Sequence, residues 1–395
     1  MINTARIRTP GLSMPAGARL PRLAPYWASV LLYAAIGVEI AMLAAWLPGT
    51  LDSAWNEPNG DFRNLYEPAR DLSLVGLYSP FLAPLLHPLT YLGELRAFRA
   101  VFFLNALSLL ILAWIAQRPL PNIEAKLAVA LGVLSIPQLH WAVRLGHLTP
   151  MLALVALLGL LTLQRRPVRG AMLLALLSIK PQYAVAPFIQ LLRDRRLDLA
   201  AIMLATAAAL ATAGFIAIGP SEAREYASIA LDWGPDSRDN LLPVQQSWLY
   251  SWPGVQISFG VEPHPLITAQ LLALSLATVM LAWANAAPMT RACVTAFAML
   301  LLTPYAQFYD FGMVAVGLAL MLRCGFDARF TATVWVGLWL AASLTQANTI
   351  FPTNDALGPA QTAGAYWLTP AILLVVAAIA VVGKQARQAE LPDGD

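Results

Sequence analysis

The chain consists of long apolar runs separated by short polar segments. Five of these runs hold at most one charged residue each and cover residues 27–47, 98–116, 199–218, 267–283 and 366–382. A helix that crosses the hydrocarbon core of a bilayer needs about 20 such residues, and each run approaches that length. The pattern therefore predicts several transmembrane helices and an all-α polytopic membrane protein.

Composition strengthens this prediction and excludes other classes. Of the 395 residues, 58% are hydrophobic and 12% are charged, and the mean hydropathy is +0.63. A soluble domain carries about 25% charged residues, so a water-soluble enzyme is excluded. The net charge of +3 is small and the basic residues form no stripe, which argues against a nucleic-acid partner. Cys293 and Cys324 lack the spacing of a zinc site, so we expect no metal site and no cofactor, and dependence on a divalent cation stays open.

Basic residues between the runs indicate how the chain is oriented. Cytoplasmic segments of membrane proteins are enriched in Lys and Arg, and Arg6, Arg8, Arg19 and Arg22 all precede the first run. We therefore expect both termini in the cytoplasm and the chain in a bacterial-type inner (plasma) membrane. The expected organisation is a cytoplasmic tail (1–25), a single transmembrane domain (26–383) with outer loops at about 49–96 and 219–263, and a second cytoplasmic tail (384–395).

We expect about twelve transmembrane helices in this domain. The expected spans lie at about 27–48, 97–117, 125–142, 147–163, 170–192 (counted as two), 199–218, 265–285, 291–304, 309–322, 331–347 and 364–382. The first outer loop has amphipathic stretches at 62–72 and 80–92, which predict short helices lying at the membrane interface. The second outer loop has a further predicted short helix at 221–231.

The run 170–192 has arginines at both of its ends. One crossing would place the second basic cluster, at 193–196, on the outer side. The run is interrupted at Lys180-Pro181-Gln182, and proline disfavours helix in the residue before it. We therefore predict two half-length helices that form a hairpin, with both basic clusters inside and the break on the outer side.

This topology places most reactive side chains on the outer face. Lys180 and Asp310 fall near breaks or span ends, where a charge still needs partners or water. An aqueous cavity that opens outward and is lined by such groups is the simplest interpretation. Glu39 lies midway along the first span and is expected to be a paired or protonated carboxyl, because no second intramembrane carboxylate is present to relay a proton.

Four motifs occur in an order that resembles glycosyltransferase family 87, a family of the GT-C superfamily. The most specific is Gly60-Asp61-Phe62-Arg63-Asn64-Leu65-Tyr66-Glu67-Pro68-Ala69, continued by Gly76-Leu77-Tyr78-Ser79-Pro80. The others are Gly146-His147, Lys180-Pro181-Gln182, and Pro304-Tyr305 with Tyr309-Asp310. Family members typically have Gln where this chain has His147, so this position departs from the pattern.

The resemblance implies a GT-C-type bundle and an inverting mannosyltransferase-like enzyme that uses a polyprenyl-phosphate sugar donor on the outer face. The implied acceptor is a cell-envelope glycolipid or polysaccharide, and Asp61 matches the catalytic acidic position. A carboxylate there suits the chemistry, since the acceptor hydroxyl must lose a proton. Cations suit the donor phosphate, and aromatic and polar side chains suit the sugar. The candidates are Lys180, Arg63 and Arg144 for the phosphate, and Tyr66, His147, Gln182, Tyr305, Asp310, Trp248 and Trp252 for the substrates.

Structural roles compete with each of these assignments. Asp61 and Asp310 are also good residues for capping a helix start, and Lys180 also suits an interfacial anchor. The tryptophans could also form the ordinary aromatic belt of a membrane protein. His147 could be a polar residue at a helix start whose hydrogen bonds are satisfied there. Arg63 could simply form an ion pair with a nearby acid.

Two other functions compete with glycosyl transfer. A transporter or lipid flippase would also use a broken helix and an outward cavity, although it should offer polar groups to both faces and the chain has no inverted repeat. A catalytically silent scaffold for a cell-envelope assembly is the third possibility. The sequence leaves the sugar, the acceptor and the oligomeric state open.

Overall fold

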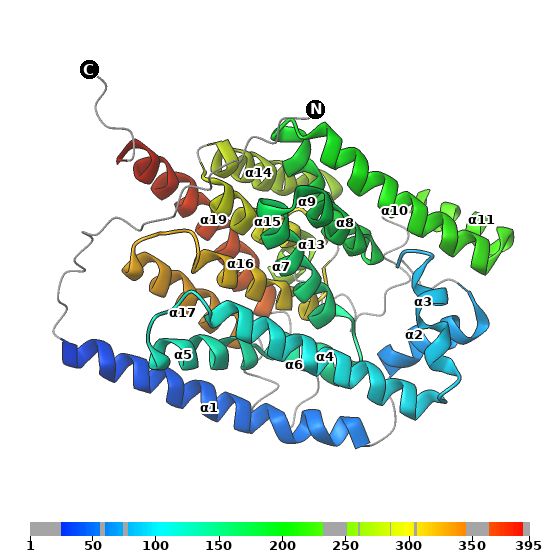
Figure 1. Cartoon of the computed structure of the whole chain (residues 1–395), viewed down its shortest axis with the longest axis horizontal. Helices are drawn as coiled ribbons and strands as arrows, with labels where there is room; N and C mark the ends of the chain where they lie inside the picture. Colours follow the sequence, from blue (N-terminus) through cyan, green and yellow to red (C-terminus); the bar gives the residue numbers. More distant parts are fainter. Residues whose placement is uncertain are drawn as a thin grey trace, which may run out of the picture.

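The computed structural model describes residues 25–55, 60–73, 78–231, 251–259, 261–284, 286–303, 306–344 and 363–389. Within these ranges every regular element is helical, and the helices pack into one bundle (Figure 1). The elements are α1 (Pro25–Trp55), α2 (Gly60–Asp71), α3 (Leu82–Thr90), α4 (Glu94–Gln117), α5 (Ile123–Leu134), α6 (Pro137–Leu145), α7 (Thr149–Arg165), α8 (Pro167–Ala175), η1 (Leu176–Ile179), α9 (Pro181–Arg193), α10 (Leu197–Ile218), α11 (Pro220–Leu231), α13 (Trp252–Ser258), α14 (Pro265–Ala284), α15 (Pro288–Leu301), η3 (Phe308–Met313), α16 (Val314–Met321), α17 (Ala328–Leu344) and α19 (Ala363–Ala389).

Several of these helices are long and apolar enough to cross a membrane. Within the described residues there are four, at Tyr33–Asp52, Glu94–Gln117, Leu197–Ile218 and Pro265–Ala284, and a fifth if the bent pair α5 and α6 is one span. Other apolar helices, such as α7 and α15, are shorter. The all-α membrane architecture is confirmed, whereas the number of about twelve spans stays a prediction.

The span expected at 125–142 is broken into α5 and α6, which meet at an angle of 48°. Pro137 occupies the first turn of α6, and Ile136 before it has extended backbone angles (φ −62°, ψ 114°). Proline disfavours helical angles in the preceding residue, which accounts for the break. This break was not among the features expected from the sequence, and the bent pair still passes as one membrane span.

The short helices predicted in the first outer segment are confirmed as α2 and α3. Figure 1 shows them together at one end of the bundle, beside the start of α4. The predicted short helix at 221–231 is likewise present, as α11. In contrast, α1 continues to Trp55, so the part of the expected loop at 49–55 is helical.

The predicted break at Lys180 is confirmed. Lys180 has extended backbone angles (φ −113°, ψ 95°) between η1 and α9. Pro167 at the start of α8 and Asp194 just after α9 line the same cavity. The two ends of the segment therefore lie together, as a hairpin requires, with Lys180 at its turn.

Two helices, α15 and α16, form the centre of the bundle. All residues of α16 and nearly all of α15 are buried. Their close approach depends on Gly317, where an added Cβ would lie 2.4 Å from the ring of Phe297. These two short helices are thus buried, whereas the long apolar helices α1, α10 and α14 are mostly exposed at the periphery.

Gly214 in α10 fixes the position of the segment that precedes α3. A Cβ at Gly214 would lie 2.3 Å from the backbone nitrogen of Phe81 and 2.4 Å from the carbonyl carbon of Pro80. Backbone atoms cannot rotate away, so Gly214→Ala is expected to destabilise the protein by about 1–3 kcal/mol in thermal unfolding. The matched control is Gly337→Ala in α17, where an added Cβ meets nothing within 4 Å. Greater helix propensity should leave that variant as stable as the parent or more so, and equal loss in both variants would contradict the packing argument.

Candidate functional site

A buried ion pair joins the helix break at Lys180 to the short helix η3. Lys180 Nζ lies 2.5 Å from Asp310 Oδ1, and their side chains are 8% and 2% exposed. The two residues are 130 positions apart in the chain. A buried charge is costly unless it is paired and hydrogen-bonded, so this contact explains how both groups are accommodated inside an apolar bundle.

Asp310 is fixed by further hydrogen bonds. The backbone N–H of Gln307 donates to Asp310 Oδ2 at 3.0 Å, as part of a capping box at the start of η3. The Thr149 hydroxyl donates to Oδ1 at 3.4 Å. Asp310 therefore does cap its helix, and it holds Lys180 as well, so the capping role does not exclude a role in a site.

Three tyrosines surround the ammonium group of Lys180. Lys180 Nζ lies 5.3 Å from the ring centre of Tyr78, 5.7 Å from that of Tyr183 and 5.1 Å from that of Tyr309. A cation within about 6 Å of an aromatic face is attracted by the ring quadrupole. These contacts orient the lysine and supply aromatic faces and hydroxyls beside it.

His147 lies in the same cluster and contacts it through both ring nitrogens. The hydroxyl of Tyr78 lies 2.5 Å from Nε2, and that of Thr149 lies 3.1 Å from Nδ1. The imidazole also lies against Tyr309, with ring centres 3.8 Å apart. The side chain of Asn105 donates to the His147 carbonyl at 2.8 Å, which anchors this turn to α4. His147 is thus a satisfied polar residue that also belongs to the cluster.

The segment Tyr78–Ser79–Pro80 is attached directly to the helix break. The backbone N–H of Ser79 donates to the carbonyl of Ile179 at 2.9 Å, one residue before Lys180. This bond and the contact of Tyr78 with His147 place the segment across the turn of the hairpin. Residues from four parts of the chain, represented by Tyr78, His147, Lys180 and Asp310, therefore meet at one point.

The first turn of α2 lies next to this cluster. A Cβ added at Gly146 would be 3.1 Å from Cβ of Phe62, so Phe62 packs against the turn that precedes His147. Phe62 also contacts Phe98, with ring centres 5.2 Å apart. Asp61 precedes Phe62 in α2, and its side chain lies outside the described residues, as do Trp248 and Tyr305.

The remaining expected site residues make other contacts. Arg63 forms an exposed ion pair with Glu94 at 2.7 Å, the alternative considered for it from the sequence. The hydroxyl of Tyr66 donates to the Thr90 carbonyl at 3.2 Å, so its ring joins α2 to α3. The guanidinium of Arg144 lies over the ring of Trp141, 5.0 Å from its centre. Gln182 is half-buried, two residues after Lys180. The indole N–H of Trp252 donates to the Ser275 hydroxyl at 2.9 Å.

Two features of the cluster differ from the expectation or extend it. We expected an open aqueous cavity, yet Lys180, Asp310 and His147 are 6%, 2% and 4% exposed, because the tyrosines cover them. Tyr183 and Thr149 were not among the expected site residues. Their proximity to Lys180 and His147 in the sequence was the only available signal. No group of three metal-binding side chains occurs in the part of the chain that the structure describes.

The arrangement suits binding of a phosphate ester next to hydroxyl-rich groups. A lysine ammonium presents three N–H donors, and a carboxylate fixes its direction. Aromatic rings beside it supply flat faces, and the hydroxyls and imidazole supply both donors and acceptors.

The hydroxyl of Tyr78 offers a test of this cluster. Tyr78→Phe keeps the ring over Lys180 and removes the hydrogen bond to His147. A net loss of about 0.5–1.5 kcal/mol in thermal unfolding is expected from one such bond. Tyr91→Phe is a suitable control, since Tyr91 is 80% exposed and the hydrogen bond of its hydroxyl, to His87, lies at the surface. Equal stability of the parent and Tyr78→Phe would show that the bond contributes nothing.

Comparisons with known proteins give one family. Neither the curated proteins nor the solved structures include a significant match. The model of glycosyltransferase family 87 matches residues 77–304, which is more than half of the chain and includes Tyr78, His147 and Lys180. The chain is therefore a membrane protein that belongs to glycosyltransferase family 87.

Proposed function

We propose that this protein transfers a mannose from a polyprenyl-phosphate donor to a glycolipid or polysaccharide acceptor, with inversion, on the outer face of the inner membrane. The observation that carries the proposal is the meeting of Tyr78, His147, Lys180 and Asp310 at the turn of the hairpin. These residues come from separate motifs that share no local structural reason to be together. A common task in one site explains their convergence.

Lys180 is the proposed contact for the donor phosphate. As the glycosidic bond to phosphate breaks, its electrons remain on the departing polyprenyl phosphate, where negative charge increases. A fixed ammonium stabilises that charge most in a site that excludes water. Asp310 accepts one N–H of Lys180 and thereby positions the remaining part of the ammonium group. Arg63 and Arg144 are proposed as further phosphate contacts near the membrane surface.

Asp61 is the proposed general base. Its carboxylate takes the proton of the acceptor hydroxyl while the hydroxyl oxygen bonds to the anomeric carbon from the side opposite the phosphate. One proton moves to Asp61 and one C–O bond replaces another, so no oxidant and no cofactor is required. Support for this position comes from Phe62, the next residue in α2, which packs against the turn that bears His147.

Substrate contacts are proposed for Tyr66, His147, Gln182, Tyr305, Asp310 and Trp248. Aromatic rings suit the apolar faces of a sugar, and the amide and imidazole suit its hydroxyls. In the described structure Tyr66 is buried between α2 and α3. Its proposed contact with sugar therefore requires movement of these two helices when substrates bind.

Reconstitution into vesicles tests the proposed function. Purified protein in vesicles is given polyprenyl-phosphate mannose with a labelled sugar, together with membrane lipids as acceptors. Transfer of the label to a second lipid or glycan is expected, with release of polyprenyl phosphate. Counterflow of a polar solute without any lipid-linked donor would instead identify a transporter and contradict the proposal.

A further inference from the structure

A second polar site lies at the opposite end of the hairpin from Lys180. A cavity of about 280 Å³ opens where α7, α9, α10 and α15 meet. Its polar lining includes Gln164, Gln190, Asp194, Arg196 and Arg291. The 13-residue helix α9 separates the two sites, which amounts to roughly 20 Å at 1.5 Å per residue. No role in the proposed glycosyl transfer involves this cavity.

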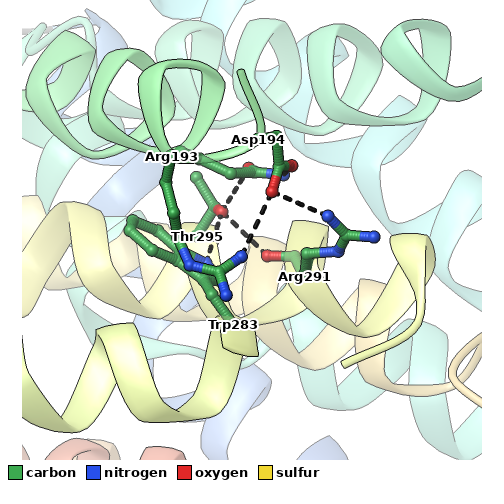
Figure 2. A network of polar contacts seen from close by, with 6 residues as sticks. Arg193, Asp194, Trp283, Arg291 and Thr295 are labelled. Carbon is green, nitrogen blue, oxygen red and sulfur yellow. Dashed lines mark hydrogen bonds and ion pairs between the residues drawn. The ribbon is translucent and has the colours of Figure 1, made fainter. Parts of the chain in front are cut away.

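The cavity holds more positive than negative charge. Asp194 accepts hydrogen bonds from Arg291 at 2.7 Å and from Arg193 at 3.2 Å, so one carboxylate serves two guanidinium groups (Figure 2). Arg196 adds a third guanidinium, 47% exposed, at 3.4 Å from the exposed Asp198. Nε of Arg291 is buried and has no hydrogen-bond partner among the described residues. Of these guanidinium groups, those of Arg196 and Arg291 line the cavity with the single carboxylate of Asp194, and this excess of positive charge favours an anion.

The backbone around Arg291 is well fixed. The hydroxyl of Thr295 donates to the Arg291 carbonyl at 2.8 Å, and the indole N–H of Trp283 donates to Thr295 at 3.1 Å (Figure 2). The Thr295 hydroxyl also contacts Gln190 Oε1 at 2.5 Å. This network joins α9, α14 and α15 and fixes the backbone from which the Arg291 side chain extends.

The walls and the rim of the cavity indicate which anion fits. Leu163, Leu191 and Leu199 form apolar walls, and Leu163 and Leu199 lie near the ends of the apolar helices α7 and α10. Arg165, Arg166 and Arg169 are exposed at the adjoining turn. A soluble anion needs no apolar walls, whereas a phospholipid carries its phosphate on a glycerol that also bears two acyl chains. Basic pockets between membrane helices bind anionic headgroups in this manner.

We propose that this cavity binds the phosphate of an anionic phospholipid, with Arg196 and Arg291 as its contacts. The basic clusters at both ends of the hairpin then lie at the headgroup level of one leaflet. The bound lipid bridges α7, α9, α10 and α15 and stabilises the hairpin that carries Lys180 at its other end.

Lipid binding to the purified full-length protein in a neutral detergent tests the proposal. The probes are phosphatidylglycerol, phosphatidylcholine and soluble glycerol phosphate, and the readouts are native mass spectrometry and the thermal unfolding midpoint. Phosphatidylglycerol is expected to bind at least about tenfold more tightly than phosphatidylcholine and to raise the midpoint. Charge-assisted hydrogen bonds justify a preference of this size.

Variants of the cavity lining show whether the lipid binds in this cavity. Arg196→Gln removes one cation, and Gln164→Glu adds a negative charge at the lining without a large change of size. Both are expected to lose most of the preference for phosphatidylglycerol, whereas Arg329→Gln, at an exposed arginine of α17, should retain it. The proposal is overturned if all three variants keep the preference, if Arg329→Gln loses it equally, or if glycerol phosphate alone gives the same stabilisation.

Discussion

Lys180→Met is expected to destabilise the folded protein by about 3–5 kcal/mol and to abolish sugar transfer. Removal of one partner from a buried ion pair leaves the other charge uncompensated, and that cost is in this range. Here the remaining group is the carboxylate of Asp310, which is 2% exposed. Unfolding of the purified protein by heat or by a denaturing detergent measures the loss of stability.

The double variant Lys180→Met/Asp310→Asn separates structure from activity. A neutral amide in place of the carboxylate removes the uncompensated charge, so much of the lost stability should return. Transfer should not return, because the proposed phosphate contact is still absent. If the double variant is as unstable as Lys180→Met, the ion pair is not the cause of the loss. If either variant transfers sugar at the parent rate, Lys180 does not contact the donor.

Asp61→Asn is expected to lower the rate of transfer by about 10²–10⁴-fold, the usual contribution of a positioned general base. The amide cannot accept the proton of the acceptor hydroxyl. Asp61 is the second residue of α2, where asparagine loses only the interaction of a negative charge with the helix start, worth about 0.3–1 kcal/mol, so α2 should still form. The substitution therefore distinguishes a base from a residue that only caps the helix. Initial rates of label transfer in vesicles provide the measurement.

The matched control for this prediction is Asp71→Asn at the other end of α2. Asp71 is exposed and pairs with its neighbour Arg70 at 2.8 Å. Its replacement is expected to leave transfer unchanged. Normal turnover by Asp61→Asn would remove Asp61 from the mechanism, even if the family assignment stands.

The sequence predicted the helical elements with unequal success. Proline favours extended backbone angles in the residue before it, which is a local effect, so the break at Lys180-Pro181 was predictable from the chain and is confirmed. The same rule applied to Pro137, but the apolar run continued across it and the bend of 48° was not expected. Helix α1 continued past the apolar run to Trp55, because hydropathy predicts burial in lipid and not the end of a helix.

The candidate site was predicted less completely than the hairpin. The motifs indicated His147, Lys180 and Asp310, and the structure brings these three together. Tyr183 and Thr149 were missed because each is an ordinary helix residue in the sequence and gains its role only from packing across the bundle. The burial of the ion pair was also not predictable, since it depends on rings from three separate segments.

A structure with a bound donor analogue tests the central claim most directly. The protein would be reconstituted in a lipid bilayer with a non-transferable phosphonate analogue of polyprenyl-phosphate mannose and imaged by electron cryo-microscopy. The phosphonate is expected within about 2.7–2.9 Å of Lys180 Nζ, the distance of a charge-assisted hydrogen bond, with the sugar toward the first turn of α2. Phosphonate density beside Arg196 and Arg291 alone, with none at Lys180, would contradict the proposed donor site.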